Sequence, residues 1–342
     1  MVKKYTVRPD QTVKQVITYM DDEHIKAVAI TEEDMSFKGI FTAGDMRKFF
    51  IRGGDMTTPI VEAMNRSPVV FHSLFEAKQY PEKLIFYPIL DNEDHLVNVI
   101  GDEISEDTST ILQNVPVVIM AGGKGTRLYP YTKILPKALI PIGEKTITER
   151  IIDSFRAYGC NDFYMILNHK SGMIKAYFNE LEKDYNLTFV EEGEFLGTGG
   201  GLTYLKGMIC STFFLSNCDI LMNADIECIY KTHCKNNNVI TLVCAMMDTM
   251  IPYGVVEINE NAELISIKEK PEYSHLTNTG LYVLEPKVID ELKLDEFIHM
   301  PDIALRYVAK GDNVGVFPVS RQSWMDMGQF SEMESMKERL GV

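Results

Sequence analysis

The chain has 342 residues, 45% of them hydrophobic and 24% charged, which is an ordinary globular composition and enough length for two domains. No stretch approaches the roughly 18 consecutive apolar residues that a membrane span needs, and residues 1–10 do not predict a signal peptide. The net charge of −15 argues against a nucleic-acid-binding protein, which normally has a basic face. We therefore expect neither a nucleic-acid nor a membrane partner.

The first hundred residues have the pattern of a small α/β domain. Helices are expected at residues 12–20 and 45–50, and short strands at residues 27–30, 38–41, 84–90 and 96–100. The second pair of strands repeats the first, which indicates a weak internal duplication of a helix–strand–strand–helix unit. The polar, acidic stretch Gly101–Thr110 then indicates a linker. We place the boundary there, with residues 1–108 in the first domain and 109–342 in the second.

Strands alternate with helices in the second region. Short apolar runs predict buried strands at residues 115–120, 163–167, 213–216 and 239–245. Thr146 and Glu149 have the spacing of a capping box at the start of one helix, and an apolar stripe predicts another over residues 173–181. Repeated strand–helix–strand connections predict an α/β fold with a doubly wound, mostly parallel, Rossmann-like sheet. Ligands of such sheets bind outside the carboxyl ends of the strands.

A glycine-rich loop, Ala-Gly-Gly-Lys-Gly-Thr-Arg-Leu at residues 121–128, follows the first of these strands. Gly122, Gly123 and Gly125 allow the backbone to approach a ligand closely and to point amide hydrogens at it. The spacing is neither that of a Walker A loop nor that of the dinucleotide-binding motif. Taken alone, the loop also fits a simple tight turn.

The residues after the loop carry a more specific pattern. Residues 122–143 read Gly-Gly-Lys-Gly-Thr-Arg-Leu-Tyr-Pro-Tyr-Thr-Lys-Ile-Leu-Pro-Lys-Ala-Leu-Ile-Pro-Ile-Gly. This run resembles the signature of the nucleotidyltransferases that activate sugar-1-phosphates, and the resemblance extends over residues 115–340. It implies the nucleotidyltransferase fold and the joining of a nucleoside triphosphate to a hexose- or hexosamine-1-phosphate, with release of pyrophosphate. The residues implied to bind the nucleotide here are Gly122, Gly123, Gly125 and Thr126.

The chemistry of this transfer explains the basic residues of the motif. A sugar-phosphate oxygen attacks the α-phosphorus, so polyanionic groups meet and charge develops on the leaving pyrophosphate. Positioning and cationic groups supply most of such catalysis. Arg127 can donate a fork of hydrogen bonds to phosphate oxygens, and the resemblance implies that Lys137 reaches the phosphates of the reacting pair. We expect both to be catalytic residues.

Two aspartates are the candidate metal ligands. Magnesium prefers one or two carboxylates together with substrate phosphates. Asp219 follows the strand predicted at residues 213–216, and Asp326 lies in Trp-Met-Asp-Met-Gly-Gln. Both match metal-binding motifs of the family, although the family more often has glycine at the position of Cys218. The predicted cofactor is therefore Mg²⁺.

Further segments resemble the substrate-binding motifs of the family. Gly197 and Thr198, in Phe-Leu-Gly-Thr-Gly-Gly-Gly-Leu, match the segment that lies near the base and ribose. The residues implied to bind the sugar phosphate are Gly254, Glu269, Lys270 and Asn278. A turn or a solvated surface position is the alternative interpretation for each of these residues.

Residues 38–47 and 58–64 resemble a CBS domain, and this resemblance covers residues 5–105. CBS modules occur in tandem and often bind adenine nucleotides. Thr42 and Asp45 match the hydroxyl and carboxylate that commonly contact ribose and phosphate, which makes them a speculative site for a regulatory nucleotide. The second repeat lacks this pattern, so a pair that only packs subunits is an equal alternative. We expect the CBS pair to help to hold a homo-oligomer.

A CBS pair in front of this transferase resembles the guanylyltransferases of bacterial nonulosonic acid biosynthesis. This resemblance implies GTP and glucosamine-1-phosphate as substrates and GDP-glucosamine as product, on the way to legionaminic acid. A mannose-1-phosphate guanylyltransferase is one alternative. Another is a catalytically silent regulatory subunit, although such chains tend to lose the catalytic Arg, Lys or Asp residues that are present here. A third is an acceptor such as phosphocholine, which the sugar-binding segments disfavour.

The six cysteines form no C-x-x-C pair and lie scattered over residues 160–244. A zinc site or a disulfide framework is therefore not expected. Free thiols are typical of proteins of the reducing cytoplasm, which is the predicted location.

Overall fold

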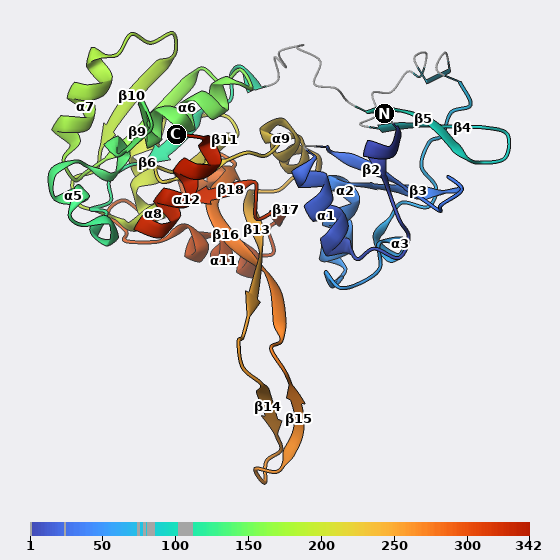
Figure 1. Ribbon diagram of the computed structural model, residues 1–342. Helices are drawn as coiled ribbons and strands as arrows, with labels where there is room; N and C mark the ends of the chain where they lie inside the picture. Colours follow the sequence, from blue (N-terminus) through green and yellow to red (C-terminus); the bar gives the residue numbers. More distant parts are fainter. Residues whose placement is uncertain (1, 24, 74–75, 78–79, 81–85, 102–111) are drawn as a thin grey trace. The chain divides into compact units, whose positions relative to one another are not determined.

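The computed structural model describes residues 2–23, 25–73, 76–77, 80, 86–101 and 112–342 (Figure 1). The chain forms two compact units, the first containing Met1–Asp107 and Met246–Leu276 and the second containing Thr108–Ala245 and Thr277–Val342. Residues 246–276 thus interrupt the second unit and belong to the first. The linker expected at residues 101–110 lies outside the described residues apart from Gly101, so the boundary after residue 108 stays a prediction.

The first unit contains a three-stranded sheet of β1 (Thr6–Val7), β2 (Ala27–Thr31) and β3 (Phe37–Thr42), in that order. β2 is parallel to β1 and antiparallel to β3. The other elements among its described residues up to residue 101 are η1 (Val2–Tyr5), α1 (Val13–Asp22), α2 (Ala43–Ile51), α3 (Ile60–Ala63), β4 (Phe86–Leu90) and β5 (Leu96–Gly101). These elements confirm the helices and strands predicted there, except that residues 84 and 85 of one predicted strand lie outside the described residues.

Local sequence explains why α1 forms. Thr12 and Gln15 make a reciprocal capping box, in which each side chain accepts a hydrogen bond from the backbone of the other. Val13, Val16 and Ile17 follow at helical spacing and are buried in the core of this unit. The apolar stripe therefore fixes which face of α1 packs against β2.

Residues 246–276 are tied to the same unit by specific contacts. Met246 is buried in the core that contains α1 residues, and Lys14 Nζ lies 2.7 Å from Glu272 Oε1 and 3.1 Å from Asp248 Oδ2. Beyond these contacts the segment forms an antiparallel hairpin of β14 (Val255–Ile258) and β15 (Leu264–Lys268).

The second unit is built on a seven-stranded sheet in the order β10–β9–β6–β11–β16–β13–β17. Its strands are β6 (Val117–Met120), β9 (Asp162–Leu167), β10 (Asn186–Glu191), β11 (Phe213–Asn217), β13 (Ile240–Met250), β16 (Glu272–Leu284) and β17 (Val314–Val319). Four neighbouring pairs are parallel, whereas β11 and β16 are antiparallel. The prediction of a mostly parallel α/β sheet is confirmed.

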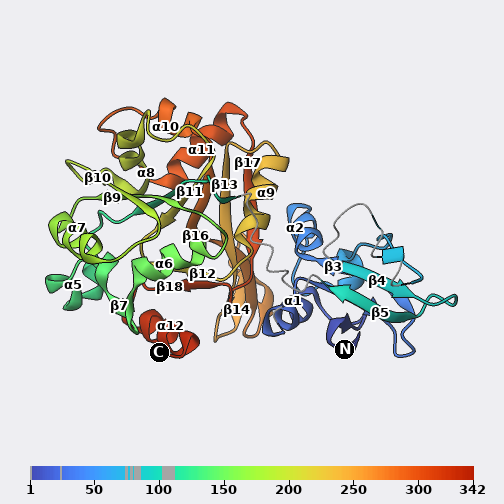
Figure 2. The same cartoon turned by 90° about the horizontal axis from the view of Figure 1, so that it is seen from above.

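Helices cover both faces of this sheet, as a doubly wound fold requires. Side chains of β6 alternate between two cores: Val117 and Ile119 belong to one, and Val118 and Met120 to the other. The first core also holds side chains of α6 (Ile147–Arg156), α7 (Ser171–Glu180), α9 (Ile226–Lys235) and α12 (Phe330–Leu340). The second holds side chains of η5 (Gly201–Leu205), α10 (Lys287–Glu291) and α11 (Met300–Lys310). Figure 2 shows α10 and α11 on the side of the strands opposite to α6 and α12.

Short elements connect the strands and helices of this unit, and some of them carry residues of the candidate site. They are η3 (Thr126–Leu128), α5 (Tyr131–Ile134), η4 (Lys137–Leu139), β7 (Pro141–Ile142), β8 (Lys145–Thr146), α8 (Gly197–Gly200), β12 (Ile220–Met222) and β18 (Trp324–Asp326). Among the described residues, no helix has the length and apolar character to cross a membrane. All six cysteines are free thiols.

Candidate active site

The glycine-rich loop leaves the carboxyl end of β6 and enters η3. Gly125 has a left-handed backbone with φ of 62° and precedes η3, which carries Arg127. A Cβ atom at Gly125 would lie 3.0 Å from Thr132 Cγ2 and 3.1 Å from Lys137 Cβ, so the loop packs closely against both residues. Gly123 has no neighbouring atom within 4 Å of such a Cβ position, and Thr126 is exposed. The packed side of the loop is thus at Gly125, and its open side is at Gly123 and Thr126.

Lys137 and Asp219 are hydrogen-bonded to each other. Lys137 Nζ donates to Asp219 Oδ2, and their side chains are only 12% and 13% exposed. Lys137 opens η4, whereas Asp219 follows β11, so the contact joins two of the segments predicted for the site. The predicted phosphate-binding lysine and one predicted metal ligand therefore lie together.

A two-stranded sheet brings the second aspartate to the first. β12 and β18 are antiparallel with Ile220 opposite Asp326, and the Met327 amide donates to the Asp219 carbonyl oxygen over 2.8 Å. Burial, and then the charge of Asp219, raise the pKa of Asp326, while the charges of Lys137 and Arg127 and the Gly328 amide act in the opposite direction. Two carboxylates that repel each other in this way are suited to share a divalent cation.

The candidate metal site consists of two carboxylates, those of Asp219 and Asp326. Among the described residues, no group of three or more His, Cys, Asp or Glu side chains could hold a metal ion. A two-carboxylate set nevertheless fits Mg²⁺, which takes most of its remaining ligands from substrate phosphates and water. The residues that would hold it are Asp219 and Asp326.

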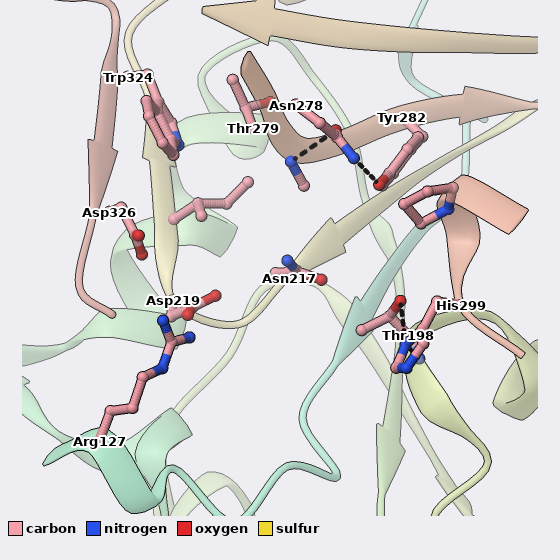
Figure 3. Close-up of a pocket in the computed structure, with 13 residues that line it drawn as sticks. Arg127, Thr198, Asn217, Asp219, Asn278, Thr279, Tyr282, His299, Trp324 and Asp326 are labelled. Atoms are coloured by element: carbon pink, nitrogen blue, oxygen red, sulfur yellow. Dashed lines mark hydrogen bonds between the residues drawn. The ribbon is translucent and has the colours of Figure 1, made fainter. Parts of the chain in front are cut away.

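These residues line a cavity of about 320 Å³ in the second unit (Figure 3). Arg127, Asp219 and Asp326 lie on one side of it, and Thr198 and His299 lie together on another. Other lining residues are Asn217, Ile220, Asn278, Thr279, Gly280, Tyr282, Pro301 and Trp324. Five residues that the sequence predicted from separate motifs therefore share one cavity: Arg127, Thr198, Asp219, Asn278 and Asp326.

β16 holds the upper wall of the cavity in Figure 3. Asn278 Nδ2 donates to Tyr282 Oη over 2.6 Å, and Asn278 Oδ1 accepts from the Gly280 amide over 3.2 Å. Gly280 has φ of 88°, and a Cβ atom there would lie 2.4 Å from Asn217 Nδ2. Only glycine at this position leaves Asn217 its place in the lining.

The segment predicted to lie near base and ribose is fixed by α11. Gly197 has φ of 85°, and a Cβ atom there would lie 2.5 Å from the Ile298 carbonyl oxygen. The Thr198 amide donates to His299 Nδ1 over 3.3 Å, and Thr198 Oγ1 accepts from the Met300 amide over 3.2 Å. Thr198 thus couples α8 to the first turn of α11.

Glu192 is a residue of this region that the sequence analysis missed. It is 4% exposed and lies one residue beyond β10, and its Oε1 accepts the Leu196 amide over 2.9 Å. Its Oε2 is buried and has no hydrogen-bond partner within the described part of the chain. A Cβ atom at Gly122 would lie 2.9 Å from that oxygen, which places the carboxylate against the first loop glycine. Burial raises the pKa of Glu192, which the Leu196 amide partly offsets.

Gly254, Glu269 and Lys270 come together in the first unit. A Cβ atom at Gly254 would lie 2.9 Å from Glu269 Oε2, and the Lys270 amide donates to the Tyr253 carbonyl oxygen over 3.3 Å. Lys270 has a left-handed φ of 45°. All of them are exposed, and none is among the described lining residues of the cavity. The structure groups these three residues with one another in the first unit, whereas Asn278 belongs to the second.

Thr42 and Asp45 form the capping box of α2. Asp45 Oδ2 accepts hydrogen bonds from the Thr42 amide and Oγ1, over 3.1 and 2.7 Å, and Thr42 Oγ1 accepts from the Asp45 amide over 3.2 Å. The two side chains thus satisfy each other and the first turn of the helix. Their sequence pattern therefore has a structural explanation that needs no ligand.

Comparisons with known proteins agree with this geometry. Residues 116–340 match the family model described as nucleotidyl transferase, and residues 1–52 match the CBS domain. A mannose-1-phosphate guanyltransferase of Yarrowia lipolytica is 31% identical over 224 residues, which are 62% of this chain and 60% of that protein. The bifunctional protein GlmU of Methanococcus aeolicus is 33% identical over 178 residues, which are 52% of this chain and 41% of that protein. The chain thus spans about half the length of the curated relatives that it matches.

Solved structures show the same fold. The crystal structure of HddC from Yersinia pseudotuberculosis has a TM-score of 0.52 at 23% identity, and the match covers 66% of this chain and 99% of that one. A putative glucose-1-phosphate thymidylyltransferase from Bacillus anthracis has a TM-score of 0.54 at 22% identity, over 66% of this chain and 94% of that one.

Proposed function

The chain belongs to the nucleotidyl transferase family, and we propose that it is a sugar-1-phosphate nucleotidyltransferase. In the reaction, an oxygen of the sugar phosphate forms a bond to the α-phosphorus of a nucleoside triphosphate. The bond between the α-phosphorus and the bridging oxygen breaks, and pyrophosphate leaves. The observation that carries the proposal is the convergence of Arg127, Asp219 and Asp326 on one cavity, with Lys137 bonded to Asp219.

Each cation of the site has a separate task. Arg127 is exposed at the cavity and can donate two parallel hydrogen bonds to phosphate oxygens. Lys137 has a largely buried side chain and provides a compact positive charge beside the loop. The charge that develops on the pyrophosphate is stabilised most by groups that are already in position before the reaction. The contact of Lys137 with Asp219 and with the glycine loop supplies that fixed position.

Asp219 and Asp326 would hold Mg²⁺. The ion, when bound, neutralises phosphate charge and acts as a Lewis acid. The repulsion by the charge of Asp219, which after burial contributes to the raised pKa of Asp326, supports this assignment. Two carboxylates that repel each other lower the stability of the fold unless a cation binds between them.

A catalytically silent regulatory subunit is the alternative from another class. Such a chain needs the fold but not the charges. The retention of Arg127 and Lys137 beside two converging aspartates therefore favours an enzyme.

The Glu192 carboxylate, whose Oε2 has no hydrogen-bond partner among the described residues, favours GTP as the nucleotide. Guanine presents two adjacent N–H donors, N1–H and the N2 amino group, on its Watson–Crick edge. A carboxylate is acceptor-only when it is ionised, and a buried acceptor without a partner is costly. Glu192 Oε2 lies against the first loop glycine and has this unmet capacity. Uracil and thymine offer a single donor flanked by carbonyl oxygens, which a carboxylate would repel.

For the acceptor we propose glucosamine-1-phosphate, with mannose-1-phosphate as the alternative. The combination of a CBS domain with the transferase supports a role in the formation of GDP-glucosamine for legionaminic acid. The mannose-1-phosphate guanyltransferases among the relatives support the alternative.

We also propose a homo-oligomer that works in the cytoplasm. The six free cysteines fit a reducing compartment. The first unit is small, and units of this size often complete the burial of their apolar surface in a symmetric dimer. Light scattering of the full chain tests this, because one chain has a mass of 38.9 kDa. A solution mass equal to that of a single chain would contradict the oligomer.

A pyrophosphate-release screen tests the reaction itself. GTP, CTP, UTP, dTTP and ATP are each combined with glucosamine-, N-acetylglucosamine-, mannose- and glucose-1-phosphate, with and without Mg²⁺. We expect the largest turnover with GTP and glucosamine-1-phosphate. A preference for UTP or dTTP would refute the base assignment, and no turnover with any pair would favour the silent subunit.

A further inference from the structure

Lys170 uses all of its side-chain donors on one short helix. Its Nζ lies 3.0 Å from the carbonyl oxygen of Thr132, 2.7 Å from that of Lys133 and 2.9 Å from that of Ile134. An ammonium group has three N–H donors and no acceptor. The last carbonyl oxygens of a helix have no partner inside it, and those of α5 are satisfied here by a side chain from another part of the sheet.

Helix α5 in turn holds the glycine-rich loop. Thr132 is 1% exposed, and its Oγ1 donates to the Gly125 carbonyl oxygen over 2.8 Å. The same side chain leaves no room for a side chain at Gly125, because a Cβ atom there would lie 3.0 Å from Thr132 Cγ2. Arg127 follows two residues later, and Lys137 packs on the same glycine. The contacts therefore run from Lys170 through Thr132 to both catalytic cations.

The backbone at Lys170 supports a specific role for this side chain. Its φ of 57° and ψ of 33° are left-handed, a conformation that costs roughly 1–2 kcal/mol for a residue other than glycine. It stands at the N-cap of α7 but makes no capping hydrogen bond with its side chain. The neighbouring His169 amide donates to the Gly122 carbonyl oxygen over 3.4 Å. Residues 169 and 170 thus contact the loop at Gly122 and, through α5, at Gly125.

We propose that Lys170 is a positioning residue for the phosphate loop of the transferase, a role that rests on the proposed function. It fixes α5, so that Thr132 holds Gly125 in its left-handed turn and Arg127 and Lys137 face the triphosphate together. Among the described residues, its ammonium group bonds to the three carbonyl oxygens and forms neither a hydrogen bond nor an ion pair with a catalytic side chain. The rival explanation is that Lys170 only stabilises the fold.

The test compares Lys170→Met, Lys170→Arg and Thr132→Val with the control Lys175→Met. Lys175 lies on the adjacent helix α7, and its one ion pair among the described residues is with Glu191 over 2.7 Å at the surface. We expect Lys170→Met to lower kcat/KM for the nucleotide by about 10–100-fold, the scale of a small misplacement of catalytic groups. The KM for the sugar phosphate should change little. Lys170→Arg should restore part of the loss, and Lys175→Met should match the wild type.

Hydrogen–deuterium exchange gives a readout that needs no activity. In Lys170→Met and Thr132→Val, amides of residues 122–135 should exchange faster, while those of the sheet core should not. The double variant should lose no more than the larger single loss, because both residues act in one chain of contacts. Equal acceleration throughout the protein would show a purely structural role and overturn the proposal, as would unchanged loop exchange with unchanged nucleotide kinetics. If Lys170→Met fails to fold, the exchange of residues 122–135 in Lys170→Arg and Thr132→Val tests the positioning role instead. If the wild type transfers no nucleotide, the proposed function fails separately, and loop exchange still decides the role of Lys170.

Discussion

Lys137 donates a hydrogen bond to Asp219, so the residue expected to contact phosphate and a residue expected to bind metal are partners before any ligand arrives. Both side chains are largely buried, and each lowers the cost of burying the charge of the other. Removal of Lys137 leaves Asp219 without its partner and close enough to Asp326 to repel it. Variants of this pair should therefore affect stability as well as turnover, and the two effects must be measured separately.

Arg127→Ala and Lys137→Ala should each lower kcat/KM by roughly 100–1000-fold, the typical cost of one preorganised donor to developing charge. Lys137→Ala should also lower the melting temperature, because Asp219 loses its partner, whereas Arg127 is exposed and its loss should leave the melting temperature unchanged. Steady-state kinetics and thermal melts measure both effects. Lys133→Ala, an exposed lysine of α5, is the control. Wild-type turnover in either variant would remove that residue from the site.

Asp219→Asn and Asp326→Asn should abolish metal-dependent turnover. The wild-type melting temperature should rise when Mg²⁺ is added, because a ligand that binds only the folded state stabilises it. Neither variant should show this rise. Asp225→Asn, which alters the N-cap of α9 away from the cavity, should keep the Mg²⁺ response. A Mg²⁺-dependent shift that survives in the double variant Asp219→Asn/Asp326→Asn would place the ion elsewhere.

The raised pKa of Asp326 predicts that, in the absence of metal, this carboxylate lowers the stability of the folded protein at neutral pH. The folded chain keeps a proton on this carboxyl at a pH where the unfolded chain has lost it. The resulting stabilisation is present at low pH and is lost as the pH rises through the raised pKa. At pH 7 the ionised group therefore destabilises the fold, and Asp326→Asn should melt at a higher temperature than the wild type without metal. The gain should shrink as the pH falls toward 4, and a gain that is equal at pH 4 and pH 7 would contradict this cause.

Glu192→Gln should reduce the preference for guanine. An amide offers one acceptor and one donor group where the carboxylate offers only acceptors. Loss of a hydrogen bond to a charged group costs about 1.5–3 kcal/mol, or roughly 10–150-fold in kcat/KM for GTP. The values for UTP should fall less. Glu191→Gln is the control, since Glu191 is exposed and pairs with Lys175. An equal decrease for every nucleotide would indicate that Glu192 only shapes the loop.

Thr42→Ala should destabilise the first unit by about 1 kcal/mol through loss of the cap of α2. Thr12→Ala, in the equivalent capping box of α1, should cost a similar amount. Urea denaturation measures both. Calorimetry with AMP then asks whether the site also binds a nucleotide: heat in the wild type that is lost in Thr42→Ala but kept in Thr12→Ala would support binding. The absence of heat in the wild type would leave Thr42 and Asp45 as a helix cap.

Elements governed by local patterns were predictable from the sequence. The capping boxes at Thr12 and Thr146 and the apolar stripes after them determine where α1 and α6 begin and which faces they bury. The position of β16 was not predictable, because its antiparallel pairing with β11 joins residues about seventy positions apart, such as Phe213 and Leu284. No local pattern specifies such a pairing.

The site residues also divide into those that the sequence predicts and those that only the folded structure shows. Arg127, Asp219 and Asp326 stand in motifs long enough to be recognised, and the ends of strands bring them together. Glu192 lies in Glu191-Glu192-Gly193-Glu194, where nothing in the sequence distinguishes the buried carboxylate from its exposed neighbours. Its fixed spacing of four residues before Leu196, whose amide it accepts, is the one signal that could have identified it. Gly254, Glu269 and Lys270 lie together because they flank the two strands of one hairpin, so their proximity follows from local strand pairing.

The glycines of α8 limit how the specificity of this protein can be changed. A Cβ atom would lie 2.5 Å from the Ile298 carbonyl oxygen at Gly197, 2.5 Å from Ile303 Cδ1 at Gly199 and 2.3 Å from the Glu296 carbonyl oxygen at Gly200. In a randomised library of this segment, functional clones would therefore keep glycine at Gly197 and Gly200, where the clash is with backbone, whereas at Gly199 the end of the Ile303 side chain can move. Gly193, whose nearest contact would be 3.7 Å from Tyr204 Oη, could vary. Directed evolution toward another nucleotide would thus have to work through the side chains around this segment, while Gly197 and Gly200 stay constant.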